Sequence, residues 1–344
     1  MAPSIIPDRE LITIATDIFS AYPSPVMKAN PLQPFLIRQG FVMLDGGLAT
    51  GMEKHGADLD DELWSAKMLI EAPELIRQVH SEFLEAGADI IATATYQASF
   101  EGFAHAGYSS DKAEQLMRLS VDLAALARES FWAETSLRHE RLKPLVAASI
   151  GPYGATLHDG SEYHGNYDLD KQALIDFHRP RMNVLADTDA DLFAFETIPS
   201  MLEAEALLEL LTEFPGKSAW LSFSCRDGAS VSHGEAFSDC VQMALQSDQV
   251  VAAGLNCTRP EFVSDLLGSV AAGQEKPLVV YPNSGEQWVP ENNQWSGEHC
   301  ESIPILEWYG KGARVLGGCC RVSANAIRNM RADLTAHTRE QSGI

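Results

Sequence analysis

Short runs of apolar residues alternate along the chain with longer segments that repeat apolar residues every three to four positions. This alternation is typical of βαβ units, which assemble a parallel sheet flanked by helices. Eight such runs occur after residue 40, and eight is the strand number of the (β/α)₈ or TIM barrel. The runs are residues 41–45, 89–95, 145–151, 191–197, 219–225, 250–256, 278–283 and 314–318.

The segments between the runs have the features of helices. Residues 73–88 begin with Pro73, repeat apolar residues such as Ile76 and Phe83, and end at Gly87. No linker or change of composition divides the region, so we predict a single α/β domain. An open doubly wound sheet would show the same alternation, although the first run lacks the Gly-x-Gly-x-x-Gly spacing of a dinucleotide-binding turn.

The first part of the chain differs from the rest in its density of prolines, which interrupt both helices and strands. We therefore expect residues 1–35 to form an N-terminal extension, residues 36–335 to form the barrel, and residues 336–344 to form a C-terminal tail.

Composition narrows the classes of partner. A chain of 344 residues that is 45% hydrophobic can bury a large core, and a net charge of -23 disfavours binding to nucleic acid or to an anionic membrane. The sequence contains neither an apolar stretch that could span a bilayer nor a secretory signal, so we predict a cytoplasmic location. The six cysteines are then expected to be reduced thiols.

Three of these cysteines lie at strand ends. Cys257 closes the sixth run, and Cys319 and Cys320 close the eighth, so a barrel would bring the three thiols to one rim. Such a set suits Zn²⁺, which binds thiolates in a tetrahedron and keeps a fourth position open when it is catalytic. The alternative is that a buried cysteine only fills the core, which is our interpretation of Cys225, Cys240 and Cys300.

Three thiolates make a metal ion a poor Lewis acid for activating water, so a substrate thiol is the better fourth ligand. A free thiol has a pKa of about 8.5 and is mostly protonated at neutral pH, whereas a metal-bound thiol is deprotonated. Three thiolate ligands therefore imply that the chemistry is alkylation of a thiol.

Several polar and aromatic residues follow the early strands. Asp45 and Glu196 are candidates to bind the ammonium of an amino-acid substrate. Gly46 and Gly47 are candidate backbone donors to its carboxylate. Each acid could equally be a loop cap or a solvated charge. Trp64 and Tyr96, together with Tyr153, could form an aromatic wall for a methylated cation, although core packing is the commoner role of such rings.

The sequence as a whole resembles the homocysteine S-methyltransferases, in the branch that uses S-methylmethionine or S-adenosylmethionine as methyl donor. The matching segments span most of residues 40–325. They include 44-LDGGLAT, 63-LWSAKML, 87-GADIIATATYQASFEGF, 149-SIGPYGA, 159-DGSEYHGNY, 178-HRPR, 254-GLNC, 279-VVYPNSGE, 297-GEHC and 317-GGCCR.

The resemblance implies a barrel in which Cys257, Cys319 and Cys320 hold zinc and the sulfur of homocysteine is the fourth ligand. It places Asp45 and Glu196 at the amino group of homocysteine. It further implies that the methyl group moves directly from a sulfonium to the thiol, forming methionine without cobalamin. The expected partners are these small molecules, with no obligate protein partner.

Two alternatives are left open. The same chemistry could use betaine or a folate as donor, although betaine-using relatives differ around Tyr96 and carry a C-terminal oligomerisation arm that this tail is too short to supply. The chain could instead be a zinc- or thiol-binding barrel without turnover. Such a protein would have no need of the expected substrate set, which comprises Asp45, Glu196 and Asn283 within 282-PNSGE.

Overall fold

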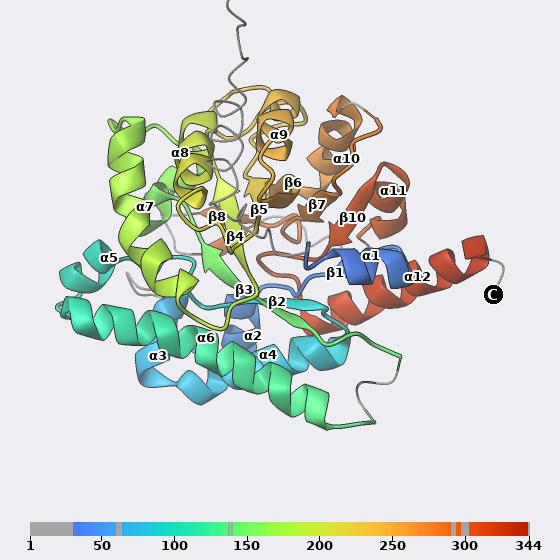
Figure 1. Ribbon diagram of the computed structural model, residues 1–344, viewed down its shortest axis with the longest axis horizontal. Coiled ribbons are helices and arrows are strands. Elements are labelled where there is room, and N and C mark those ends of the chain that lie inside the picture. The colour runs from blue at the N-terminus through green and yellow to red at the C-terminus, as the bar shows by residue number, and fades with distance from the viewer. Residues whose placement is uncertain are drawn as a thin grey trace, which may run out of the picture.

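The computed structural model of the protein describes residues 30–59, 64–136, 138, 140–270, 272–289, 294–296 and 303–342. Eight parallel strands form its centre, and each overlaps one of the apolar runs (Figure 1). They are β1 (Val42–Met43), β2 (Ile90–Ala92), β3 (Leu145–Ile150), β4 (Leu192–Ile198), β5 (Ala219–Phe223), β6 (Val250–Asn256), β7 (Leu278–Tyr281) and β10 (Ala313–Leu316).

The strands are hydrogen-bonded in the order β1-β10-β7-β6-β5-β4-β3-β2. The two outer strands of this order meet through a parallel bridge between Leu44 and Ile90. On either side of the bridge, the Asp45 N–H donates to the Ile90 carbonyl at 3.1 Å and the Asp89 N–H donates to the Met43 carbonyl at 2.7 Å. The sheet is therefore a nearly closed barrel, which confirms the predicted (β/α)₈ fold and excludes the open doubly wound sheet.

Helices surround the barrel, as Figure 1 shows. They are α1 (Gln33–Gln39), α2 (Leu48–Lys54), α3 (Met68–Glu71), α4 (Pro73–Ala86), α5 (Phe100–His105), α6 (Ser110–Ala133), α7 (Lys171–Ala186), α8 (Met201–Leu211), α9 (Phe237–Leu245), α10 (Pro260–Ser269), α11 (Ile305–Gly310) and α12 (Ala324–Ser342). Three 3₁₀ turns, η1 (Trp64–Lys67), η2 (Tyr153–Thr156) and η3 (Ser161–Tyr163), lie in the loops after β1 and β3. None of the described helices is long and apolar enough to cross a membrane.

Alternate strand residues enter two hydrophobic clusters. Met43 of β1 belongs to the cluster between the strands and the helices, whereas Val42 belongs to a second cluster. This second cluster also contains Leu32 and Phe35 at the start of α1, so the segment just before β1 packs onto the barrel. Residues 1–29 of the expected extension lie outside the described residues. At the other end of the chain, α12 continues to Ser342, past the position where the tail was expected to begin.

The buried carboxylate of Asp89 stabilises the junction between β1 and β2. Asp89 accepts hydrogen bonds from the Met43 N–H at 3.0 Å and from the side-chain amide of Gln39 at 2.6 Å. Arg331 of α12 lies 3.0 Å from both carboxylate oxygens, and Arg141 lies 3.3 Å from one of them. These contacts tie α1, β1 and α12 together at the amino ends of the strands, away from the rim where function is expected.

The periodicity did not predict one element. After β7 the chain forms a short antiparallel hairpin of β8 (Gln287–Val289) and β9 (Gln294–Ser296).

Candidate active site

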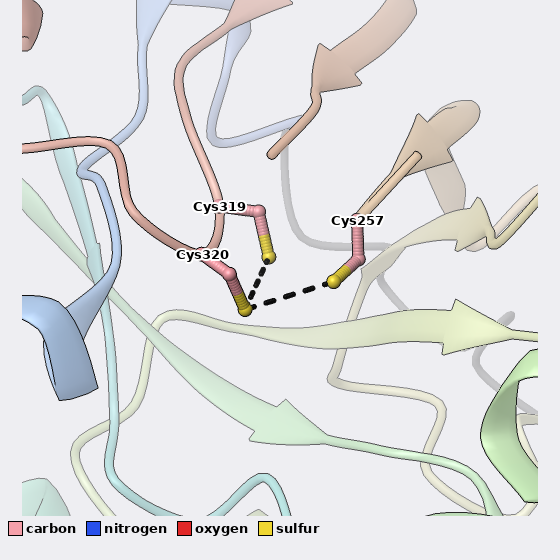
Figure 2. A group of neighbouring side chains, drawn as sticks. All are labelled: Cys257, Cys319 and Cys320. Carbon is pink, nitrogen blue, oxygen red and sulfur yellow. Dashed lines mark hydrogen bonds between the residues drawn. The ribbon is translucent and has the colours of Figure 1, made fainter. Parts of the chain in front are cut away.

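Three cysteine side chains converge at the carboxyl ends of β6 and β10 (Figure 2). The sulfur of Cys320 lies 3.7 Å from that of Cys257 and 3.9 Å from that of Cys319. All three sulfurs lie within 4.8 Å of one another. Residues far apart in the sequence thus meet as the barrel topology predicts.

Backbone hydrogen bonds hold these residues in place. Cys257 has a φ of 46°, in the left-handed region, and its N–H donates to the Tyr281 carbonyl at 3.2 Å. The Cys319 N–H donates to the Pro282 carbonyl at 2.8 Å, and the Cys320 carbonyl accepts from the Ser284 N–H at 3.1 Å. The segment after β7 therefore lies between the two groups of thiols and fixes their separation.

The two glycines before the cysteine pair allow a close approach of backbones. A Cβ at Gly317 would lie 2.6 Å from the Cβ of Leu44, and a Cβ at Gly318 would lie 2.2 Å from the Val322 side chain. The Gly318 N–H also donates to the Asp45 carbonyl at 3.1 Å. Glycine is needed here because any side chain would push the cysteine pair away from the rim.

The spacing of the sulfurs fits a tetrahedral metal ion. Metal–sulfur bonds of about 2.3 Å give a tetrahedron with edges of about 3.8 Å. The two shorter sulfur–sulfur distances, 3.7 and 3.9 Å, match this edge. Soft thiolates in a tetrahedron are the ligands that Zn²⁺ prefers, and three of them leave one position for a substrate. Hydrogen bonds from Cys319 and Cys320 hold the pKa of Cys257 well below the usual value of a thiol.

Two further side chains contact the thiols. The hydroxyl of Tyr163 lies 3.3 Å from the sulfur of Cys257, and the amide of Asn256 donates to Cys319 at 3.9 Å. The Asn256 side chain is itself oriented, because its Oδ1 atom accepts from the Thr197 N–H at 2.6 Å. Such contacts orient metal ligands. Sequence reasoning missed both residues, although they lie in the segments 159-DGSEYHGNY and 254-GLNC that carried the resemblance.

Asp45 lies at the same rim and is only 7% exposed. One carboxylate oxygen accepts the Ala92 N–H at 2.8 Å. Burial raises the pKa of Asp45 well above its usual value, and the nearby charge of Glu196 raises it further. The two acids predicted to bind one ammonium therefore lie close enough to interact.

Glu196 is held by two hydroxyls. Tyr281 donates to one carboxylate oxygen at 3.0 Å and Ser149 donates to the other. The Tyr281 hydroxyl in turn accepts the Trp220 N–H at 2.9 Å, which leaves its own proton free to point at Glu196. Burial raises the pKa of Glu196 to about 7, with a contribution from the charge of Cys257. A substrate cation would relieve the cost of ionising this buried acid.

The two glycines after β1, Gly46 and Gly47, differ in whether their N–H groups could bind a substrate. A Cβ at Gly46 would lie 2.4 Å from the Val322 carbonyl oxygen, so the backbone is tightly packed there. The Gly47 N–H donates to the same carbonyl at 3.0 Å. Gly47 therefore does not offer the free donor that we expected of the pair, and only Gly46 stays a candidate for binding a substrate carboxylate.

The expected aromatic wall is only partly described. The hydroxyl of Tyr96 interacts electrostatically with Cys257 and Glu162, and burial raises its pKa well above the usual value. Tyr153, by contrast, packs edge-on against Tyr167 at 5.2 Å and against Phe177 at 5.1 Å, which is a core role. The side chain of Trp64 and the segment 297-GEHC, with Cys300, lie outside the described residues.

Asn283 shapes the turn after β7. Its N–H donates to the Thr258 carbonyl at 3.2 Å, and its side-chain oxygen accepts the Gly285 N–H at 3.0 Å. A direct contact with substrate stays a prediction for this residue, as it does for Tyr96 and Gly46.

A buried network that the sequence analysis did not assign supports the loop after β3. Glu203, His178 and Arg181 are all at most 1% exposed. Glu203 accepts from the Tyr153 N–H at 2.6 Å and lies 2.9 Å from the His178 ring, while Arg181 donates to the Gly151 carbonyl. The network fixes the start of the loop that carries η3 and Tyr163.

Comparisons with known proteins show the family of the chain. The family model described as homocysteine S-methyltransferase matches residues 42–334. Homocysteine S-methyltransferase YbgG of Bacillus subtilis is 47% identical, over 88% of this chain and 97% of that protein. A selenocysteine Se-methyltransferase of Brassica oleracea var. italica is 46% identical, over 86% of this chain and 90% of that protein.

A solved structure shows the same likeness. The crystal structure of the homocysteine methyltransferase MmuM from Escherichia coli, in its metallated form, superposes with a TM-score of 0.79 at 43% identity, covering 88% of this chain and 100% of that one. The chain therefore belongs to the homocysteine S-methyltransferase family, which confirms the resemblance and the enzyme class predicted from its sequence.

Proposed function

We propose that the protein uses zinc to transfer a methyl group from a sulfonium donor, S-methylmethionine or S-adenosylmethionine, to the thiol of homocysteine, forming methionine. The observation that carries the proposal is the convergence of three thiols within 4.8 Å of one another, with two sulfur–sulfur distances close to the edge of a zinc–thiolate tetrahedron. Two buried acids with raised pKa values lie at the same rim. The family indicates homocysteine as the methyl acceptor, and the three thiols indicate a bound metal ion.

Cys257, Cys319 and Cys320 would hold the zinc ion. Zinc bound there lowers the pKa of a substrate thiol, so that the thiol is deprotonated at neutral pH. The crystal structure of a relative in a metallated form agrees with metal binding by this fold.

Asp45 and Glu196 would bind the ammonium of homocysteine. Burial disfavours the ionised forms of both side chains in the free protein. A cation between them would stabilise the ionised forms. The Tyr281 and Ser149 hydroxyls keep Glu196 in one orientation, so the amino acid is bound with its side chain directed along a fixed path. This positioning reduces the entropy cost of bringing two substrates together.

The transfer itself balances without a redox partner. A lone pair of the homocysteine sulfur forms the new bond to the methyl carbon, and the bond from that carbon to the donor sulfur breaks with its electron pair. The sulfonium leaves as a neutral thioether, and the thiol proton of homocysteine has already gone to solvent. Because one relative is named a selenocysteine Se-methyltransferase, a selenol is a second candidate acceptor for the same site.

Metal analysis combined with a methionine-forming assay tests the proposal. The purified protein should contain about one zinc ion per chain and should form methionine from homocysteine with either sulfonium. Turnover with betaine or a methylated folate, but with neither sulfonium, would refute the donor. Zinc binding without methionine formation from any donor would favour the alternative of a non-catalytic metal-binding barrel.

A further inference from the structure

Glu162, in η3, differs from the other acids of the rim. Its Oε2 atom is buried and has no hydrogen-bond partner among the described residues. By contrast, Asp45 accepts a backbone N–H, and both oxygens of Glu196 accept hydroxyl protons. A buried carboxylate oxygen without a donor is costly, so this position is suited to binding a cation.

Glu162 lies close to the thiol cluster. The next residue, Tyr163, places its hydroxyl 3.3 Å from the sulfur of Cys257. The Glu162 carbonyl accepts from the Ser224 hydroxyl at 3.0 Å, which fastens η3 to the segment after β5. Burial raises the pKa of Glu162 to about 7, and the charge of Cys257 contributes. The carboxylate therefore lies within electrostatic reach of the thiol cluster.

Of the charged groups on the proposed substrates, the positive sulfur of the donor has to come closest to this cluster, because the acceptor sulfur attacks the methyl group attached to it. The ammonium groups lie further along each substrate. We propose, resting on the function proposed above, that the Glu162 carboxylate binds the sulfonium of the methyl donor, on the side of the site that Tyr96 borders. Asp45 and Glu196 are then left for the ammonium of the acceptor.

The charge change in the reaction gives this role a kinetic signature. The sulfonium is positive in the bound donor and becomes neutral as the methyl group leaves. A carboxylate beside it therefore stabilises the bound donor more than the transition state, so its loss weakens donor binding without slowing the chemical step. A residue that only positioned the metal would lower kcat and metal content instead.

The test compares wild type with Glu162→Gln, Glu162→Asp and Asp168→Asn. Asp168 is an exposed acid in the same loop and serves as a control for the loss of one negative charge. We expect Glu162→Gln to raise the KM for S-methylmethionine roughly tenfold or more. Its kcat should not fall, and its zinc content and KM for homocysteine should match wild type. Glu162→Asp should recover most of the donor affinity, and Asp168→Asn should behave as wild type.

Calorimetric binding supplies a readout besides turnover. Glu162→Gln should bind S-methylmethionine more weakly but bind methionine, whose sulfur is neutral, as well as wild type does. Equal weakening of both ligands, an unchanged donor KM, or an aspartate variant as weak as the glutamine variant would overturn the assignment. Failure of the proposed function would be visible separately, as a wild-type protein that forms no methionine from either sulfonium.

Discussion

The contact between Tyr163 and Cys257 allows a quantitative prediction about metal affinity. With zinc bound, Cys257 is a thiolate and has no proton to donate, so the hydroxyl at 3.3 Å must be the donor. Tyr163→Phe removes this hydrogen bond and keeps the ring. We expect zinc affinity to fall while the barrel stays intact.

The magnitude follows from the single contact that is lost. A hydrogen bond to a charged group contributes about 1.5–3 kcal/mol, which corresponds to roughly a 10- to 150-fold change in a dissociation constant. Removal of contacts to metal ligands typically lowers affinity by about 10- to 100-fold. Both lines of reasoning place the expected loss for Tyr163→Phe between about tenfold and a hundredfold.

Competition with a chromogenic zinc chelator measures the affinity, with thermal unfolding of the metal-free proteins as a check on folding. Tyr153→Phe is the matched control, because Tyr153 belongs to the same loop region and its ring packs against Tyr167 and Phe177. This control should bind zinc as wild type does. An affinity of Tyr163→Phe within twofold of wild type would refute the reasoning that this hydroxyl stabilises the thiolate.

Four further predictions concern the thiol cluster, the substrate acid Glu196 and the junction between β1 and β2. Cys319→Ser should abolish zinc binding and activity while the far-ultraviolet circular dichroism stays that of the barrel; global unfolding would contradict this. Glu196→Gln should raise the KM for homocysteine with little change in zinc content. Burial holds the pKa of Glu196 at about 7 against 4.5 in the unfolded chain, so the folded protein binds more protons in this window. The free energy of unfolding of substrate-free wild type, relative to Glu196→Gln, should therefore fall by about 3 kcal/mol as the pH rises from 4.5 to 7, and a constant difference would disprove this. Asp89→Asn should lower the free energy of unfolding by about 3–5 kcal/mol in denaturant titrations, because it leaves Arg331 and Arg141 without their buried partner; a loss below 1 kcal/mol would contradict this.

The hydrophobic pattern predicted the barrel because each strand buries both faces and is therefore a continuous apolar run. The same topology explains why Cys257 could be placed beside the Cys319–Cys320 pair: strand ends of a parallel barrel share one rim wherever they lie in the sequence. The carboxylates of Asp45 and Glu196 follow from the same rule. The rim position of a residue at a strand end can thus be predicted from the order of the strands along the sequence.

Contacts made by loops were not predictable in this way. Tyr163 reaches Cys257 only because η3 lies over the rim, and that path depends on the buried Glu203 network and on Ser224. The strands β8 and β9 have three residues each, too few for an alternation of apolar and polar positions to be recognised in the sequence. The hydrogen bond of the Gly47 N–H to Val322 likewise depends on the path of the chain before α12.

The thiols are held in place by contacts that do not involve sulfur, which bears on how metal binding relates to folding. The Cys257 N–H donates to a carbonyl in the last residue of β7, and the Cys319 N–H donates to the carbonyl of the residue that follows. The Gly318 N–H donates to the Asp45 carbonyl after β1. Each of these hydrogen bonds joins neighbouring strands of a barrel whose core is already buried. In small zinc domains the metal supplies the folding free energy, because no core exists without it. Here the buried core and these hydrogen bonds hold the ligand residues independently of a metal, so loss of the metal should remove activity without unfolding the chain.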